Sequence, residues 1–324
     1  MKAIICTKYG SPDVLQLQEV AKPAPKDDEV LIKIQAASVN ARDWRFMRAR
    51  PFFIRLKPGG LLRPKNKILG GDVAGRIEAV GSHVTQFKIG DEVFGYLPSA
   101  TGRGTISVYV CANDHLIPRK PANLSFEQAA AVPVAALTAL HGLRDNGNLQ
   151  PGQKVLINGA SGGVGTFAVQ IARAFGAEVT AVCSTRNLDL VRSLGADHLI
   201  DYMRDDFTRH GQRYDLILAV NGYHPLSDYL RALSPEGRHV VAGGSMLQLF
   251  QAALQGRRAA KTGGQKISIV SLVKNRQDLV FMKELLESGQ IVPVIDGCYP
   301  LSKTADALWY FEKEHARGKV VITV

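Results

Sequence analysis

The residues Asn158–Gly165, which read NGASGGVG, could support two kinds of chemistry. Read as Gly-x-Ser-x-Gly, this run would display Ser161 as the nucleophile of a hydrolase. Read as a glycine-rich turn between a strand and a helix, it would place backbone N–H groups around a phosphate, where the helix dipole favours negative charge. The segments on either side of the turn decide between the two interpretations.

These flanking segments favour a dinucleotide site. The apolar run Lys154–Asn158 precedes the turn, and a helical apolar repeat follows it. Small residues occupy the three required positions: Ala160 for the tight turn, Gly162 for approach of the pyrophosphate, and Gly165 for helix–strand packing. A hydrolase elbow needs several sheet strands and helices before it, whereas short barrel-like strands precede this one. We therefore predict cofactor binding by Ala160, Ser161, Gly162, Gly163, Val164 and Gly165.

The end of the next strand indicates which nucleotide binds. An NAD site usually carries an acid there, which holds the ribose 2′-hydroxyl. This chain instead has Ser184 and, two residues later, Arg186. The planar guanidinium of an arginine suits a 2′-phosphate, although a surface arginine on the following helix is the alternative. The sequence predicts NADPH as the cofactor.

Two patterns divide the chain. Short apolar or alternating runs over residues 2–118 predict a barrel-like β fold, with the last two at Thr105–Ala112 and His115–Pro118. The capping box Ser125–Gln128 predicts a helix to about His141, and strand–helix alternation follows. Such alternation predicts a parallel, doubly wound Rossmann sheet. The expected strands are Lys154–Asn158, Glu178–Cys183, Asp197–Ile200, Tyr214–Val220, Arg238–Gly243 and Lys266–Leu272.

The expected domains follow from these patterns. Residues 1–122 form a catalytic domain that the β-rich tail, residues 276–324, completes, and residues 123–275 form the nucleotide-binding domain. The N-terminus lacks the features of a signal or transit peptide, and the four cysteines have no C-x-x-C spacing. We expect a cytoplasmic protein with reduced thiols and neither a disulfide framework nor a cysteine-built zinc site.

Net charge is +11, and much of it lies in residues 42–67, where nine Lys or Arg accompany one acid, Asp43. Aromatic and leucine residues are interleaved among these cations. The segment could attract an anionic cofactor to a cleft, or it could make a weak contact with an anionic membrane surface. Nothing in the sequence indicates a nucleic-acid partner.

The chain resembles the medium-chain dehydrogenase/reductase superfamily, and within it the zinc-independent quinone oxidoreductase and enone reductase branch. The resemblance covers nearly the whole chain and rests on motifs in a fixed order. These motifs are Ala37–Asn40 with Asp43-Trp44, Gly70–Gly75 leading to Ala79–Gly81, Gly90–Val93, Ala136–Ala139, the glycine turn, and Gly195–Asp197 with Ile200–Tyr202.

The resemblance implies a GroES-like β-barrel catalytic domain beside the Rossmann domain. It also implies a homodimer that pairs the last Rossmann strand edge to edge. The chain departs from the zinc enzymes of the superfamily, because Asn40, Gly71 and Val134 stand where their metal ligands would be. We therefore expect no metal, although a zinc alcohol dehydrogenase remains the alternative that bound metal would support.

The resemblance also implies site residues. Asn40 would direct its amide toward the nicotinamide, and Asp43 would organise the neighbouring backbone. The tyrosine that the family often places after this motif is missing, so solvent is the expected proton donor. Further cofactor contacts are implied for Thr138, Tyr202, Asn221, Gly222, Gly243, Gly244, Ser245, Ser271 and Lys319.

Without a metal to polarise a carbonyl, the acceptor must supply its own electron sink. Quinones and α,β-unsaturated carbonyls do so, because the charge of the hydride delocalises into the ring or the enolate. The expected function is hydride transfer from NADPH to such small molecules. The alternative function is an NADPH-binding, membrane-peripheral protein with little reductase activity.

Overall fold

The computed structural model describes residues 1–56, 60–97, 104–209, 211–222, 224–244, 249–252, 254, 264–273, 275–314 and 316–324. The chain forms two compact units. The first unit contains Met1–Val134, Lys274–Gly289 and Pro293–Val324, and the second contains Ala135–Val273 and Gln290–Val292.

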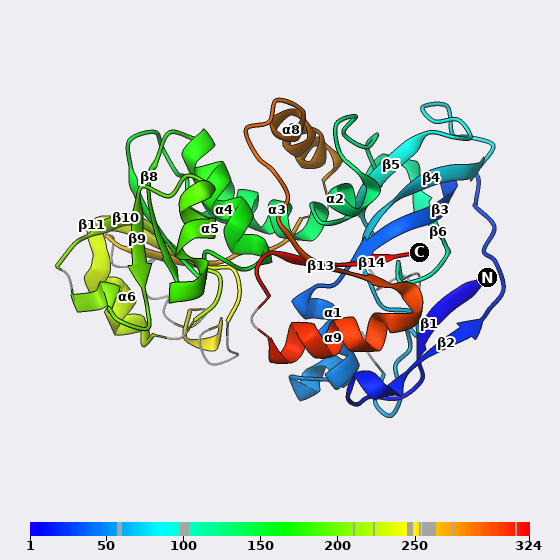
Figure 1. The fold of residues 1–324 in the computed structure, drawn as a ribbon, viewed down its shortest axis with the longest axis horizontal. Coiled ribbons are helices and arrows are strands. Elements are labelled where there is room, and N and C mark those ends of the chain that lie inside the picture. The colour runs from blue at the N-terminus through cyan, green and yellow to red at the C-terminus, as the bar shows by residue number, and fades with distance from the viewer. Residues whose placement is uncertain are drawn as a thin grey trace. The chain divides into compact units, whose positions relative to one another are not determined.

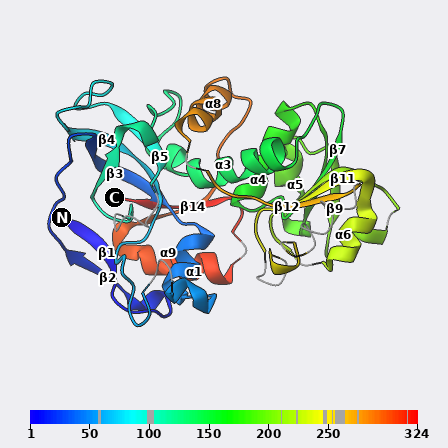
Figure 2. The same ribbon diagram turned by 180° about the vertical axis from the view of Figure 1, so that it is seen from behind.

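The second unit is built on a six-stranded sheet in which every strand is parallel to its neighbours. Figures 1 and 2 show this sheet and its helices from two sides. The order β12-β11-β10-β7-β8-β9 confirms the doubly wound prediction. The strands are β7 (Lys154–Asn158), β8 (Glu178–Cys183), β9 (His198–Asp201), β10 (Tyr214–Ala219), β11 (Leu233–Val241) and β12 (Lys266–Ile269).

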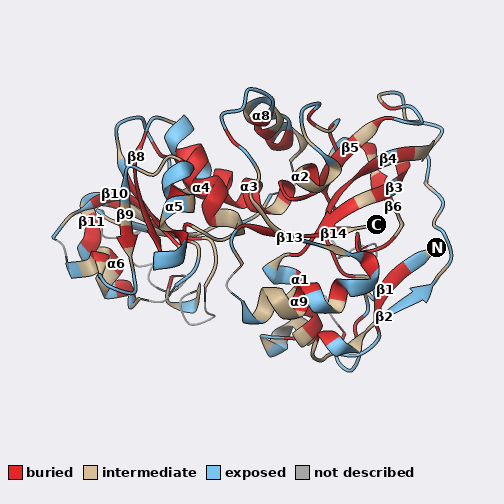
Figure 3. Ribbon diagram, viewed as in Figure 1, coloured by how far each residue is buried: buried red, intermediate tan, exposed pale blue. Residues whose placement is uncertain are grey.

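The central strands of this sheet are buried on both faces, which explains their continuous apolar sequences. The strands β7, β8 and β10 are buried over most of their length, as Figure 3 shows for β8 and β10. The helix α4 packs on β7 and β8 through the apolar stripe that contains Phe167 and Ile171. The helices are α3 (Pro133–Leu140), α4 (Gly163–Ala174), α5 (Leu188–Ser193) and α6 (Leu226–Ala232).

The first unit contains a sheet with the order β13-β14-β3-β4-β5, and β6 also pairs with β3. The last strand, β14, runs antiparallel to β3, so the C-terminal tail completes the sheet of the N-terminal segment. The strands are β1 (Lys2–Cys6), β2 (Leu15–Glu19), β3 (Glu29–Ser38), β4 (Asp72–Val80), β5 (Glu92–Tyr96), β6 (Tyr109–Asn113), β13 (Ile295–Pro300) and β14 (Lys319–Thr323).

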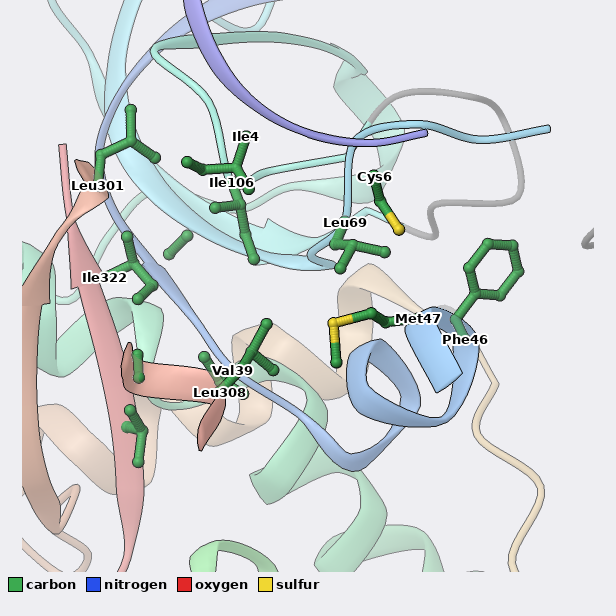
Figure 4. Close-up of a cluster of buried hydrophobic side chains, with 13 residues drawn as sticks. Ile4, Cys6, Val39, Phe46, Met47, Leu69, Ile106, Leu301, Leu308 and Ile322 are labelled. Atoms are coloured by element: carbon green, nitrogen blue, oxygen red, sulfur yellow. The ribbon is translucent and has the colours of Figure 1, made fainter. Parts of the chain in front are cut away.

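The core of the first unit joins residues from both ends of the chain. Ile4 and Ile106 pack with Met47, which lies on α1 (Ala41–Arg48). Leu308, from α9 (Thr304–Lys313), and Ile322 reach the same cluster from the C-terminal tail (Figure 4). This packing fixes α1 and the tail together, which matters because both carry polar site residues. The two remaining helices are α2 (Phe126–Ala130) and α8 (Arg276–Glu287).

The structure corrects two details of the strand prediction. The run Thr105–Ala112 is a strand only from Tyr109, and His115–Pro118 forms no strand. The side chain of Asn113 accepts a hydrogen bond from the backbone N–H of His115, and this bond starts a 3₁₀ turn at Asp114. Short apolar runs do not distinguish a strand from such a turn.

The helix predicted from Ser125 to His141 begins at its capping box but is interrupted. The helix α2 ends at Ala130, α3 begins at Pro133, and a π-helical turn follows over His141–Asn146. Proline lacks an N–H group and occupies the first position of α3, where none is required. Because α2 packs on β3 and β4, the first unit extends to Val134, past the boundary predicted at residue 122. Among the described residues, no helix is long and apolar enough to cross a membrane.

Candidate active site

The glycine turn leads from β7 into α4, as a dinucleotide site requires. Gly159 has φ of +89°, and a Cβ there would lie 2.8 Å from the backbone N of Asn221. The backbone N–H groups of Gly159 and Ala160 both donate to the carbonyl of Val182 on β8, which fixes the turn against the sheet. The N-terminus of α4 begins beyond Gly162, so its first N–H groups are available to an anion.

Two glycines of the turn are required for different reasons. A Cβ on Gly165 would lie 2.1 Å from the carbonyl oxygen of Gly159, so close packing of α4 on β7 excludes any side chain. A Cβ on Gly162 would lie 3.7 Å from its nearest neighbour, the carbonyl oxygen of Gly159, and the φ of −81° at Gly162 suits any residue. The fold therefore gives no internal reason for glycine at 162. A pyrophosphate bound at the turn would give such a reason, because it needs the space that a side chain at position 162 would fill. The turn therefore fits a dinucleotide cofactor.

A buried asparagine joins the two serines predicted to bind the cofactor. The Nδ2 group of Asn187 donates to the hydroxyl oxygen of Ser161 at 2.9 Å and to that of Ser184 at 3.1 Å. Because both hydroxyl oxygens accept from the amide, both hydroxyl hydrogens can point elsewhere, and neither is donated to another of the described residues. Two O–H donors directed by one amide suit an anionic group. No periodic pattern or motif in the sequence indicates this role of Asn187.

The other predicted nucleotide contacts follow the C-terminal ends of parallel strands. These ends share one edge of the sheet, where ligands of doubly wound folds bind. Arg186 is exposed after β8, Tyr202 is exposed after β9, and Asn221 is exposed after β10. Gly243 and Gly244 follow β11, and exposed Ser271 follows β12. Thr138 lies on α3, nearly buried, and Ser245 lies outside the described residues.

The first unit contains a separate polar network centred on Asp72, the fully buried first residue of β4. Its Oδ2 accepts from the hydroxyl of Ser38 at 2.6 Å and from Nδ2 of Asn40 at 2.8 Å. Its Oδ1 accepts from the backbone N–H of Val134 at 2.9 Å. The Nζ of Lys319 lies 3.5 Å from Oδ2. Sequence reasoning missed Asp72 as a site residue, although an acid in the apolar run GGDVAG was a signal.

Lys319, which was predicted to contact the cofactor, is part of this network. Its side chain is buried, and Nζ donates to Oδ1 of Asn40 at 2.6 Å and to the carbonyl of Val39 at 3.2 Å. Burial lowers the pKa of Lys319, while the carboxylates of Asp72 and Asp43 raise it. With Asp72 as its third acceptor, the ammonium group uses all three of its donors within the first unit.

The same contacts fix the amide of Asn40. Its carbonyl oxygen accepts from Lys319, and Nδ2 is directed at Asp72 and, at 3.4 Å, at the carbonyl of Ser38. The predicted donor to a substrate is therefore held in the network. To donate elsewhere, Asn40 would have to give up the long bond to Ser38.

Asp43 holds the backbone around the site. Its two carboxylate oxygens accept from the backbone N–H groups of Asn40 at 2.9 Å and Gly70 at 3.0 Å, and its side chain is buried. Burial, with a smaller contribution from the nearby Asp72 carboxylate, raises the pKa of Asp43 to about 6, against the lowering effects of the two backbone hydrogen bonds and of Lys319. These bonds fix the start of α1 and the loop before β4.

The positions that carry zinc ligands in related enzymes offer no ligand set here. Asn40 is engaged by Lys319 and Asp72, and Val134 is apolar. Gly71 has no side chain to offer as a ligand, and a larger residue does not fit there because its Cβ would lie 2.8 Å from Cε2 of Tyr96. The three residues do not fit a tetrahedral zinc site, which needs nitrogen, sulfur or carboxylate ligands at fixed geometry.

Comparison with known proteins assigns the family. Residues 26–122 match the alcohol dehydrogenase GroES-like domain, and residues 194–322 match a domain described as a zinc-binding dehydrogenase. A chloroplastic quinone-oxidoreductase homolog from Spinacia oleracea is 35% identical to this protein, and the match covers 99% of this chain and 98% of the Spinacia chain. The chain belongs to the medium-chain dehydrogenase/reductase superfamily, in its zinc-independent quinone oxidoreductase branch.

Other members of this superfamily agree in sequence and fold. The 2-methylene-furan-3-one reductase of Solanum lycopersicum is 37% identical over 99% of this chain and 79% of its own. The solved quinone oxidoreductase from Coxiella burnetii has a TM-score of 0.88 at 29% identity and covers 100% of this chain and 99% of its own. These matches confirm a medium-chain oxidoreductase with a GroES-like domain, a Rossmann-like domain and a nicotinamide cofactor.

The different reasons for the two glycines can be separated by substitution. Gly162→Ala should lower the free energy of unfolding by no more than about 1 kcal/mol, the cost of alanine at a helix N-cap. It should weaken NADPH binding at least roughly tenfold, because its methyl group enters the space for the phosphate. Gly165→Ala should instead destabilise the fold by about 3 kcal/mol through overpacking.

Chemical denaturation and fluorescence titration with NADPH measure the two effects. Unchanged NADPH affinity in a folded Gly162→Ala protein would show that the phosphate does not bind at this turn.

Proposed function

We propose that this protein is an NADPH-dependent, zinc-independent reductase of quinones or of the C=C bond of α,β-unsaturated carbonyls. The observation that carries the proposal is the set of groups at the zinc-ligand positions. No metal ligand set is present at these positions, because the Asn40 amide is already hydrogen-bonded, Gly71 lies beneath the Tyr96 ring and Val134 is apolar. These residues therefore hold no Lewis acid. Acceptors that delocalise the charge of a hydride need none.

The preference for NADPH is supported by the end of β8. Exposed Arg186 directly precedes Asn187, which orients the two serine hydroxyls, and a guanidinium and two hydroxyl groups can donate to a 2′-phosphate. The carboxylate of Asp201, at the end of β9, is already hydrogen-bonded through both oxygens. Its Oδ2 accepts from the hydroxyl of Thr185 and its Oδ1 from the backbone N–H of Met203. When bound, the reduced nicotinamide supplies the hydride. The protein's own groups position the two reactants and exclude water.

A second candidate function, docking on an anionic membrane surface, is supported by residues 50–67. The side chains of Phe52, Leu61 and Leu62 are exposed, and that of Leu62 has a relative exposure of 84%. Arg50, Arg63, Lys65 and Lys67 are exposed with them, and the one acid of residues 42–67, Asp43, is buried. Attraction of a small anion needs no exposed apolar side chains, whereas insertion at a lipid headgroup boundary uses both kinds of residue.

We also propose a homodimer through β12. This strand is an edge of the parallel sheet and pairs only with β11 among the described strands. Three of its four residues are partly buried, and it carries two isoleucines. An apolar edge of this kind is protected when a second copy pairs with it.

The proposed reaction predicts a pattern of acceptors. NADPH oxidation should be rapid with quinones, alkyl enones and 2-alkenals, and should be undetectable with saturated aldehydes, which lack an electron sink. NADH should support the reaction much less well. Absorbance of the reduced nicotinamide measures each rate.

Substitution of Arg186 tests the cofactor assignment in the same assay. Arg186→Ala should raise the KM for NADPH at least about tenfold and leave the KM for NADH within about twofold, because only NADPH carries the 2′-phosphate. Arg192→Ala is the matched control, since Arg192 is exposed on α5 and pairs with Asp189. Equal effects of Arg186→Ala on both cofactors would exclude the assignment.

The docking candidate predicts flotation with vesicles rich in anionic lipid at low salt, and release at high salt. The double variant Leu61→Ser/Leu62→Ser should float poorly, whereas Ile89→Ser, which alters an isolated exposed side chain, should behave as the wild type. If the wild-type protein does not float at low ionic strength, this candidate function is excluded.

The dimer predicts a solution mass of twice the 35.2 kDa of one chain. Ser268→Lys would place two like charges at the paired edge and should give a monomer in sedimentation equilibrium. Ser288→Lys, at the exposed end of α8, should leave the mass unchanged. A monomeric wild-type protein would contradict the proposal.

A further inference from the structure

The hydroxyl of Tyr96 has an unusual setting in the first unit. Tyr96 is the last residue of β5 and lies directly opposite Asp72 in the register of β4 and β5. Its side chain is 6% exposed, and its ring lies over Gly71 so closely that a Cβ there would be 2.8 Å from Cε2 and 3.1 Å from Cδ2. The ring is therefore held in one place, next to the Asp72 network.

The hydroxyl oxygen of Tyr96 already has a donor. Nη1 of Arg42, in the first turn of α1, donates to it at 2.6 Å. In the part of the chain that the structure describes, the Tyr96 hydroxyl donates to no protein group. Its own hydrogen can therefore be given to a ligand, while the guanidinium supports negative charge on the phenolic oxygen.

Asn40, the donor predicted from the sequence, lacks this freedom. Its amide group is directed at Asp72 and Ser38, and its carbonyl accepts from Lys319. Arg42 follows Asn40 by two residues, and Tyr96 pairs with Asp72, so the hydroxyl belongs to the same end of the sheet. Tyr96 thus offers the O–H donor that the segment after Asn40 lacks.

We propose that Tyr96, held by Arg42, donates its proton to the carbonyl oxygen of the conjugated substrate. The proposal rests on the proposed reductase function and extends it to the missing proton donor. Burial keeps the pKa of Tyr96 above its usual value, against the lowering effect of Arg42, so the phenol is protonated at neutral pH. A positioned acid of this kind contributes about 10²- to 10⁴-fold to a rate.

For an enone, a C–H bond of the bound reduced nicotinamide would supply the hydride with its electron pair, leaving the nicotinamide oxidised, and a new C–H bond would form at the β-carbon of the substrate. The C=C pair then moves between the α-carbon and the carbonyl carbon, and the C=O pair moves onto oxygen. The O–H bond of Tyr96 breaks with its electrons left on the phenolic oxygen, and a new O–H bond forms on the substrate. The tyrosinate, stabilised by Arg42, then takes a proton from water, and the enol becomes the ketone in solvent.

Tyr96→Phe removes the hydroxyl and keeps the ring over Gly71. The kcat for an alkyl enone should fall about 100-fold, while NADPH binds within about twofold of the wild-type affinity. The kcat for an electron-poor quinone should fall less than about tenfold, because its reduced anion is stabilised without a donor. Tyr310→Phe is the matched control, since its hydroxyl donates to Asp296 at 2.7 Å in the same unit, and it should keep the wild-type rates.

The pH dependence separates proton donation from a structural role. Loss of the proton from Tyr96 should produce an alkaline fall in the enone rate, and Arg42→Gln should move this fall to higher pH because Arg42 lowers the pKa of Tyr96. Titration of tyrosinate absorbance, with Tyr96→Phe as the blank, should show the same upward shift without any turnover. This measurement also serves if Tyr96→Phe proves poorly folded.

Three results would overturn the proposal. One is a folded Tyr96→Phe protein that keeps the enone rate within about twofold. Another is an alkaline limb and a tyrosinate titration that do not move in Arg42→Gln. If the wild-type protein binds NADPH but reduces neither enones nor quinones, the proposed function itself fails, and the role of Tyr96 fails with it.

Discussion

The organisation of the first unit depends on a buried carboxylate, Asp72, that is satisfied from four places in the chain. Ser38 ends β3, Asn40 precedes α1, the N–H of Val134 lies in α3, and Lys319 begins β14. A buried ion pair of this kind adds little net stability, because desolvation opposes the attraction. Removing one partner costs about 3–5 kcal/mol, because it leaves an unpaired charge in the interior. The network therefore fixes where these elements meet more than it raises stability.

The geometry of this site depends on contact between the C-terminal tail and the N-terminal segment of the chain. Lys319 lies 279 residues from Asn40 in the sequence, yet its ammonium group fixes which way the Asn40 amide points. The position of Lys319 is set in turn by pairing of β14 with β3 and by the apolar core that α9 shares with α1. Apolar packing at the two ends of the chain thus determines the orientation of one polar side chain.

The features predicted correctly from the sequence are those encoded locally. The doubly wound sheet follows from strand–helix alternation, and the tight turn between β7 and α4 follows from small residues at fixed spacing after a strand. Asn187 and Tyr96 could not be assigned in this way. The role of Asn187 arises from its reach to Ser161, 26 residues away, and that of Tyr96 from Arg42, 54 residues away. The break between α2 and α3 was missed because apolar periodicity continues through Pro133, although the proline marked it.

The charge balance of the network explains why a metal-free site suits only some acceptors. With a pKa of about 6, Asp43 is ionised at neutral pH, and the buried ammonium group of Lys319 faces both it and the carboxylate of Asp72. An ammonium group donates hydrogen bonds but has no vacant orbital, so it cannot act as the Lewis acid that a zinc ion supplies. All three of its donors are also used within the protein. The charge of the Lys319 ammonium group therefore compensates the carboxylates and does not polarise a substrate carbonyl. The substrate must then contain its own electron sink.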